Sequence, residues 1–294
     1  MESFYPISTQ RLFLGFHMKL FAFIVMMAFS FFVSAQSAPK KNESLILQAD
    51  TLLDRQDFAG ALALYTKIIE KTKPVSADDY RVLYKRAYCY YALGDFENAL
   101  GDINQVIQQV PDEQAKLMRA YINQELEDYE AQLQDLNELL ANNPGNPEFL
   151  RWRASVLMES ERYAEAQKDI QALLDYQPSP ELKSYLGLTY YYQNKPDSAI
   201  AIFDEVIEGS PGYLPSYLYA ASLSLEQEAF DLALAYISQG LSVDRDNLTL
   251  LFYKGIALVE NENTDEGCKC MTKAFAGGID DAADYLKNYC YGVD

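Results

Sequence analysis

The chain has 294 residues, of which 49% are hydrophobic, and this content can fill a folded core and excludes a wholly disordered protein. Acidic residues number 43 against 24 basic ones, so the net charge is −19 at pH 7. This excess argues against nucleic acid and anionic membranes as partners, because both are bound through Lys and Arg. The single histidine, His17, leaves little for histidine-based catalysis or metal binding.

The first element predicted in chain order is a leader. Residues 20–33 form an apolar run behind Lys19, too short for a membrane span of about 20 residues and typical of a signal-peptide core. Small residues precede the bond between Ala35 and Gln36, where we expect cleavage. The mature chain would then have no membrane span and would be exported, to the periplasm or outside the cell. The alternative is an uncleaved anchor, lengthened by the apolar residues that precede Lys19.

After the leader, one sequence pattern recurs at intervals of 33 or 34 residues, following a first interval of 38. An aromatic residue often stands three positions before a small one, as in Phe96 and Ala99. A second small residue lies twelve positions upstream of the first, and a large apolar residue lies four positions downstream. The downstream small positions, of which six are Ala or Gly, are Ala61, Ala99, Gln132, Ala166, Ala199, Ala233 and Gly267. The upstream ones are Ala49, Ala87, Ala120, Ala154, Gly187, Ala221 and Gly255.

This pattern predicts antiparallel helix pairs. A small residue on each helix lets the two backbones approach closely, and large residues at helical spacing fill the remaining gap. Prolines at one phase end four of the units, because proline cannot continue a helix. No single pair can bury its whole apolar face, so neighbouring pairs must stack into a solenoid. The four prolines are Pro111, Pro144, Pro178 and Pro211.

The repeat resembles the tetratricopeptide repeat family over about residues 42–275. The resemblance implies an all-α fold, a right-handed α-solenoid of about seven helix pairs. Gln132 and Gly267 depart from the family's packing alanine. The residues of the fifth unit that match the family consensus are Leu186, Gly187, Tyr190, Ala199, Phe203 and Pro211.

A capping helix is predicted after the seventh unit. Gly277 and Gly278 end one helix, and a new one begins at Asp280 with Ala283 and Leu286 on its apolar stripe. Such a helix covers the open end of a helical array. The predicted division is therefore a signal peptide at 1–35, a short tail at 36–41, the solenoid at 42–279 and the capping helix at 280–294.

The four cysteines divide into two kinds. Cys268 on the last repeat helix and Cys290 on the capping helix reach similar heights if the helices run antiparallel, so we expect a disulfide between them. The sequence is equally compatible with two free thiols packed in the core at these positions. Cys89 is expected to be a buried apolar residue. Cys268 and Cys270 point in different directions on one helix, so no metal site is expected from them.

No catalytic motif is found in the sequence. It contains no Walker glycine loop, no dinucleotide-binding glycine pattern and no metalloprotease histidine pair. A cysteine nucleophile would need a histidine, and the mature chain would have none. We therefore predict a protein that is not an enzyme and that needs no cofactor.

The family resemblance assigns the inner wall of the solenoid to positions two, five, nine, twelve and thirteen of each first helix. The Lys and Asn that clamp a terminal carboxylate in the family's best-known groove are absent from positions five and nine. The wall is instead aromatic in units two, three and five, and five of seven thirteenth positions are acidic. Tyr88 and Tyr121 share the ninth position, so we expect them side by side. The predicted partner-binding residues are Tyr84, Tyr88, Tyr91, Tyr121, Arg151, Tyr191, Tyr192, Phe252, Glu125, Glu159 and Glu226.

These features predict a protein-interaction scaffold of the bacterial envelope that binds a protein or peptide segment in its groove. The acids at the groove's edge would favour Lys or Arg in that segment, although residues beside turns are also commonly polar for solubility alone. Two alternatives remain. The chain is also compatible with a structural subunit of an envelope assembly, or with a glycan- or wall-binding module that uses stacked tyrosines. The location of exposed apolar area discriminates between a groove and an outer or terminal surface.

Overall fold

The computed structural model describes residues 42–71 and 77–291. The predicted signal peptide and the tail that follows it lie outside the described residues. Within the described ranges the chain is all helical, with fifteen α-helices and a single π-helical turn. The all-α repeat fold predicted from the sequence is therefore confirmed.

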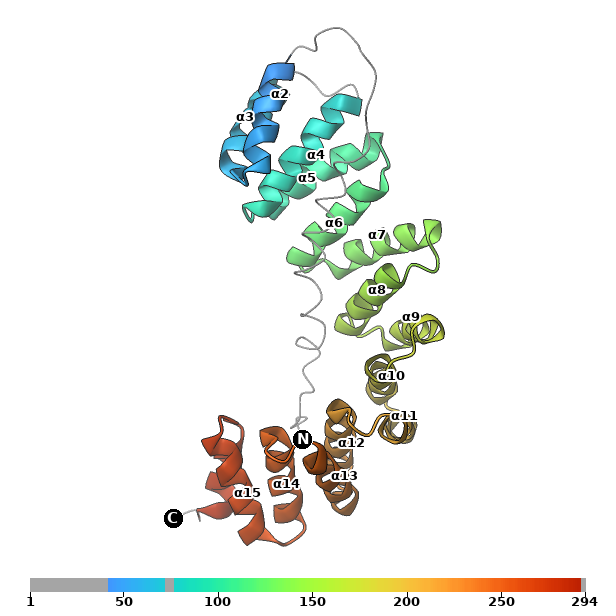
Figure 1. Cartoon of the computed structure of the whole chain (residues 1–294), viewed down its shortest axis with the longest axis vertical. Helices are drawn as coiled ribbons and strands as arrows, with labels where there is room; N and C mark the ends of the chain where they lie inside the picture. The colour runs from blue at the N-terminus through green and yellow to red at the C-terminus, as the bar shows by residue number, and fades with distance from the viewer. Residues whose placement is uncertain (1–41, 72–76, 292–294) are drawn as a thin grey trace. The chain divides into compact units, whose positions relative to one another are not determined.

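Two compact units make up the described chain, residues 42–156 and residues 157–291, and their boundary falls within one helix. Figure 1 shows the helices in chain order. The helices that begin in the N-terminal unit are α2 (Glu43–Asp54), α3 (Phe58–Lys71), α4 (Ala77–Ala92), α5 (Phe96–Gln109), α6 (Glu113–Glu125), α7 (Tyr129–Asn142) and α8 (Pro147–Glu159). Those of the C-terminal unit are α9 (Tyr163–Tyr176), α10 (Pro180–Tyr192), α11 (Pro196–Gly209), α12 (Leu214–Glu226), α13 (Phe230–Val243), α14 (Leu248–Glu260), α15 (Thr264–Ala276), α16 (Ala282–Tyr285) and the π-helical turn η2 (Leu286–Cys290).

The turn inside each helix pair requires one residue in the left-handed backbone region. Gly94 supplies it in the second pair, with φ +80° and open space on the side where any other residue would carry its Cβ. The other pairs use longer polar residues, which accept the conformation at a steric cost that glycine avoids. The left-handed residues recur with the period of the repeat and are Gln56, Gly94, Glu127, Glu161, Asn194, Glu228 and Glu262.

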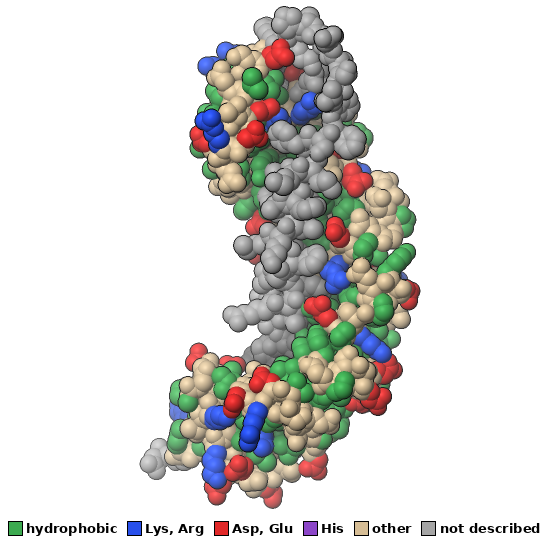
Figure 2. Space-filling model, viewed as in Figure 1, with side chains coloured by type: hydrophobic (Ala, Val, Ile, Leu, Met, Phe, Trp, Pro, Cys, Tyr) green, Lys and Arg blue, Asp and Glu red, His purple; other side chains and the backbone are tan. Residues whose placement is uncertain are grey.

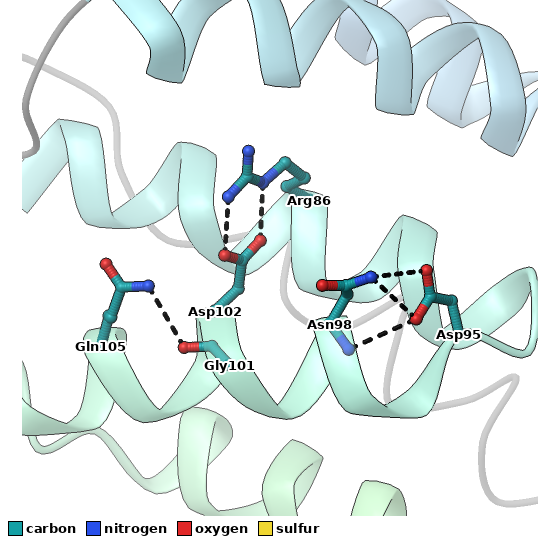
Figure 3. Close-up of polar contacts among 6 residues, drawn as sticks. All are labelled: Arg86, Asp95, Asn98, Gly101, Asp102 and Gln105. Atoms are coloured by element: carbon teal, nitrogen blue, oxygen red, sulfur yellow. Dashed lines mark hydrogen bonds and ion pairs between the residues drawn. The ribbon is translucent and has the colours of Figure 1, made fainter.

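Side chains at the start of some second helices then satisfy the free backbone N–H groups. The Asp95 carboxylate accepts from the backbone N–H of Asn98 at 3.3 Å at the beginning of α5 (Figure 3). Asp128 accepts from the N–H of Ala131 at 3.0 Å in the same way at α7. An aspartate in this capping position contributes about 1 kcal/mol to a helix.

Close approach of the two helices in each pair defines the core. Every small position predicted from the repeat is buried, including Ala87 and Ala99, both at 0% exposure. The approach is tightest between α14 and α15. A Cβ added to Gly267 would lie 2.8 Å from the backbone oxygen of Gly255, closer than packed atoms approach.

Paired charges join the helices of the N-terminal unit. Arg86 on α4 donates two hydrogen bonds of 2.7 Å to Asp102 on α5 (Figure 3). One repeat later, Arg119 on α6 contacts Asp135 on α7 at 2.6 Å and also donates to Asn104 on α5 at 2.9 Å. Asp135 is fully buried, and burial raises the pKa of its carboxyl, although the Arg119 hydrogen bond opposes this. Arg119 thus fixes both its own helix pair and the contact with the preceding pair.

The C-terminal cap differs in winding from the regular helix predicted over 280–289. After α16 the chain widens into η2, whose backbone closes with a bond from the N–H of Tyr291 to the oxygen of Leu286 at 3.1 Å. The buried residues of the cap are four positions apart, a spacing that puts them on one helix face. Ala282 and Leu286 therefore face the array, whereas Ala283, which was expected on the apolar stripe, is exposed.

A disulfide joins Cys268 on α15 to Cys290 on η2, with Cα atoms 5.7 Å apart, and it is the pair expected from the helix register. Cys89 and Cys270 are free thiols, and both are buried. Burial raises the pKa of the Cys89 thiol to about 12, which keeps it protonated and unreactive.

We predict opposite effects for two glycine substitutions. Gly267→Ala should destabilise the protein by about 1–3 kcal/mol, because the added methyl meets backbone atoms that cannot yield cheaply. Gly101→Ala, on an open face of α5, should stabilise by up to about 1 kcal/mol through its higher helix propensity. Thermal unfolding of both variants measures this. Equal melting temperatures would contradict the tight α14–α15 contact.

We also predict the thiol count. In the native oxidised protein, none of the described cysteines should react with a thiol reagent, because two are joined in a disulfide and two are buried. Unfolding should expose two thiols, and reduction should expose four. The Cys268→Ser and Cys290→Ser double variant should unfold more easily by up to about 3 kcal/mol, since the cross-link restricts the unfolded chain. Peptide mapping that finds four free thiols would contradict the pairing.

Candidate functional site

In the C-terminal unit the first helices lie side by side, because α12 contacts both α10 and α14. In the N-terminal unit, a hydrogen bond connects the ends of the first helices α4 and α6. Its donor is the Tyr91 hydroxyl, and its acceptor is Glu125 at 3.2 Å. Within each unit, the predicted site residues therefore lie on helices that neighbour one another.

Three predicted tyrosines of α4 are half-buried rather than fully exposed. The Tyr88 ring meets the edge of Phe58 with ring centres 5.9 Å apart, and Tyr91 meets Phe96 in the same manner at 5.5 Å. Burial raises the pKa of Tyr84 to about 12, and the nearby charge of Asp112 adds to the effect. These phenols are neutral hydrogen-bond donors at pH 7 and keep part of each ring at the surface.

Tyr121 has a different environment from its ninth-position counterpart Tyr88. Its ring packs against Trp152 with centres 4.4 Å apart, and only 6% of Tyr121 is exposed. The Trp152 indole donates to Gln124 at 3.1 Å, and Gln132 donates to the same oxygen at 3.3 Å. Tyr121 therefore belongs to the packing between repeats and offers little surface to a partner.

Phe252 is also placed inside the array. It is 5% exposed, and its ring meets the edge of Tyr285 from the C-terminal cap at 5.7 Å. Arg151 on α8 and Glu159 at the end of that helix are both half-buried. Burial raises the pKa of the Glu159 carboxyl.

In the C-terminal unit, Tyr191 and Tyr192 at the end of α10 form a compact aromatic group. Their ring centres are 4.9 Å apart, and Tyr192 stacks on Tyr163 at 4.8 Å. The Tyr191 hydroxyl donates a 2.6 Å hydrogen bond to Oε2 of Glu226 at the end of α12. Burial raises the pKa of Glu226, and this hydrogen bond partly offsets the rise.

The same arrangement thus occurs twice, and the position-by-position analysis of the sequence did not predict it. A tyrosine at the twelfth position donates to a glutamate at the thirteenth position of the next repeat, in the pairs Tyr91–Glu125 and Tyr191–Glu226. The signal in the sequence is a Tyr followed 34 or 35 residues later by a Glu. A related contact lies at the cap, where the charge of Glu260 and a hydrogen bond to it raise the pKa of Tyr289.

Other features of the described residues concern the type of site. They contain no group of three or more His, Cys, Asp and Glu side chains arranged to hold a metal ion. None of the helices in this part of the chain is long and apolar enough to cross a membrane. On the face shown in Figure 2, basic side chains are scattered among acidic ones.

Stacked helix pairs with tyrosines and acids along the first helices define a helical-repeat protein of the interaction-scaffold class. A family model described as tetratricopeptide repeat matches residues 46–114, 91–147, 117–166 and 153–213, more than half of the chain. The chain belongs to the tetratricopeptide repeat family. Such proteins are generally non-catalytic scaffolds that bind other proteins. Helices α12 to α15 extend the helix pairs beyond the matched residues.

Solved structures with the same fold are similar over most of this chain. The C-terminal part of a repeat-containing protein from Cytophaga hutchinsonii is 19% identical, with a TM-score of 0.60, and covers 82% of this chain and 99% of its own. A tetratricopeptide repeat protein from Parabacteroides merdae is 20% identical, with a TM-score of 0.52, covering 83% and 97%. PilW, a type IV pilus biogenesis factor, is 16% identical, with a TM-score of 0.51, covering 72% and 100%. No curated protein sequence matches the chain.

We predict that Tyr121 and Tyr91 respond differently to substitution. Tyr121→Ala should destabilise the protein by about 3 kcal/mol, because it removes a buried ring. It should also shift the fluorescence of Trp152, the only tryptophan, to longer wavelength. Tyr91→Phe should change stability by at most about 1 kcal/mol, since it loses one hydrogen bond to an exposed acid. A Tyr121→Ala protein with unchanged melting temperature and fluorescence would refute the packing role.

Proposed function

We propose that this protein is an exported, non-enzymatic scaffold of the bacterial envelope that holds a segment of a partner protein against its first helices. The observation that carries the proposal is the set of half-exposed tyrosines on those helices, each beside a ring or an acid of a neighbouring helix. The tyrosines are Tyr88, Tyr91, Tyr191 and Tyr192.

Tyrosine suits such a wall for a physical reason. It offers a large contact area with a polar tip and loses little conformational entropy on binding, which is why it concentrates at interfaces. The acids Glu125 and Glu226 add negative potential beside the rings. A partner segment that carries Lys or Arg would associate faster with such a surface.

Export is supported by two independent features. One is the apolar run at residues 20–33 behind a positive charge, which suits a signal peptide. The other is the disulfide between Cys268 and Cys290, a bond that persists in oxidising compartments and is rare in the cytosol. Both favour the periplasm or the exterior as the place where the scaffold works.

A second candidate is supported by the C-terminal end of the array. Phe275, Tyr289 and Tyr291 are 46%, 46% and 69% exposed there. Exposed aromatic residues at the end of a solenoid suit a structural subunit that contacts another component through its end. This function would leave the first helices unused.

Site-directed photo-crosslinking in cells distinguishes the two. We place p-benzoylphenylalanine at Tyr91 or Tyr192 on the first helices, at Tyr291 on the cap, and at Gln105 on the exposed side of α5 as the matched control. The proposal predicts one discrete cross-linked protein from positions 91 and 192 and none from 105. Cross-links from position 291 alone would overturn it in favour of the structural subunit.

A further inference from the structure

The inner-wall pair formed by Tyr191 and Glu226 has an unused acceptor. Oε2 of Glu226 accepts the 2.6 Å hydrogen bond from Tyr191, whereas Oε1 is buried and has no hydrogen-bond partner among the described residues. Burial and the Tyr191 hydrogen bond alone shift the pKa of this carboxyl, with no contribution from a lysine or arginine of the described residues. A buried carboxylate oxygen without a donor is costly, so native proteins rarely keep one without a reason.

The surroundings of this oxygen are aromatic. Tyr191 and Tyr192 lie on α10, and Tyr253 on α14 is close enough for its phenol to sense the Glu226 charge. Tyr192 senses the same charge. Tyrosine rings attract cations to their faces, and this attraction grows where water is excluded. A carboxylate that contacts one phenol, which itself packs against the Tyr192 ring, can therefore bind a cation through both its charge and the nearby ring faces.

We propose that Tyr191, Tyr192, Tyr253 and Glu226 form a receptor for a single cationic side chain, a lysine or arginine of the bound partner segment. This assignment rests on the proposed scaffold function and specifies what its C-terminal unit recognises. The ammonium or guanidinium donates to Oε1, and Tyr191 continues to hold Oε2.

Access to Oε1 requires only a small movement. The Glu226 side chain as a whole is half-buried, so a small shift of the side chains around it, with the Tyr191 hydrogen bond kept, is what a cation needs to reach Oε1. The hydrogen bond from Tyr191 restricts the remaining freedom of the carboxylate and orients it. A cation that arrives with the partner thus meets an acid that is already oriented and poorly hydrated. A charge pair strengthens binding most at such an acid.

The Tyr91–Glu125 pair provides the comparison within the same chain. It has the same repeat positions, but Glu125 is exposed and its hydrogen bond is longer, at 3.2 Å. An exposed carboxylate is well hydrated and gains little from a cation. The two glutamates therefore make a matched pair for an experiment, with Glu226 as the receptor and Glu125 as the control.

The test is an NMR titration of the full chain labelled with ¹³C at glutamate side chains. The probes are N-acetyl-lysine methylamide, its arginine analogue and the neutral Nε-acetylated lysine derivative. The two cations should shift the Glu226 carboxyl signal saturably, and the neutral compound should not. Because Glu226→Gln lacks that signal, the affinities of the variants are measured by calorimetric titration. Glu226→Gln should weaken binding by about tenfold or more, equivalent to about 1.4 kcal/mol, whereas Glu125→Gln should leave it unchanged. Tyr191→Phe should fold and weaken binding less than Glu226→Gln.

Three results would overturn the receptor. These are equal binding of the neutral derivative, equal loss in both glutamine variants, and a Glu226 carboxyl that stays protonated above pH 8. The experiment is also separable from the scaffold proposal. Cation binding at Glu226 without cross-links from the first helices would support the receptor and reject the proposed partner segment. Cross-links from the first helices, with Glu226→Gln changing neither cation binding nor cross-linking, would support the scaffold and reject the receptor.

Discussion

The close approach of two helices at a small residue is the constraint on which the other features of each pair depend. Ala87 and Ala99 are fully buried because any larger side chain there would separate α4 from α5. Where the third pair has Gln132 instead, its amide donates to the Gln124 side-chain oxygen, which also accepts from the Trp152 indole. The same Trp152 packs against Tyr121, so the polar contact at this packing position and the burial of a tyrosine share one side chain.

Sequence periodicity predicts which face of its own helix a residue occupies. This information was sufficient to predict the helix pairs and the approach of Cys268 to Cys290. It does not predict the side chain that lies opposite on the next repeat. Tyr88 and Tyr121 have the same phase, but only the second meets a tryptophan. For the same reason, the shift from Ala283 to Ala282 could not be predicted, because either alanine lies within one turn of Leu286 and only the docking of the cap on the array selects between them.

The two units achieve their register by different means. In the N-terminal unit, Arg86 and Arg119 form ion pairs with partly or fully buried aspartates. Such pairs add little net stability, because desolvation offsets their attraction, but they leave few alternative alignments. The corresponding positions on α10 and α12 hold Leu186 and Ala220, both buried, so these two helices have no such arginine, and the unit ends in a disulfide.

The acids of the first helices break a local rule, and the way they are accommodated indicates their role. Helices α6 and α12 end on Glu125 and Glu226, where the helix dipole disfavours negative charge. Burial disfavours the charge on Glu226 further, since it raises the pKa of that carboxyl. A single tyrosine hydroxyl from the preceding repeat stabilises each acid, and for Glu226 it leaves one oxygen unpaired. A carboxylate oxygen that is buried without a donor is costly, so this position departs from the local rules that the rest of the helix follows, as positions kept for binding often do.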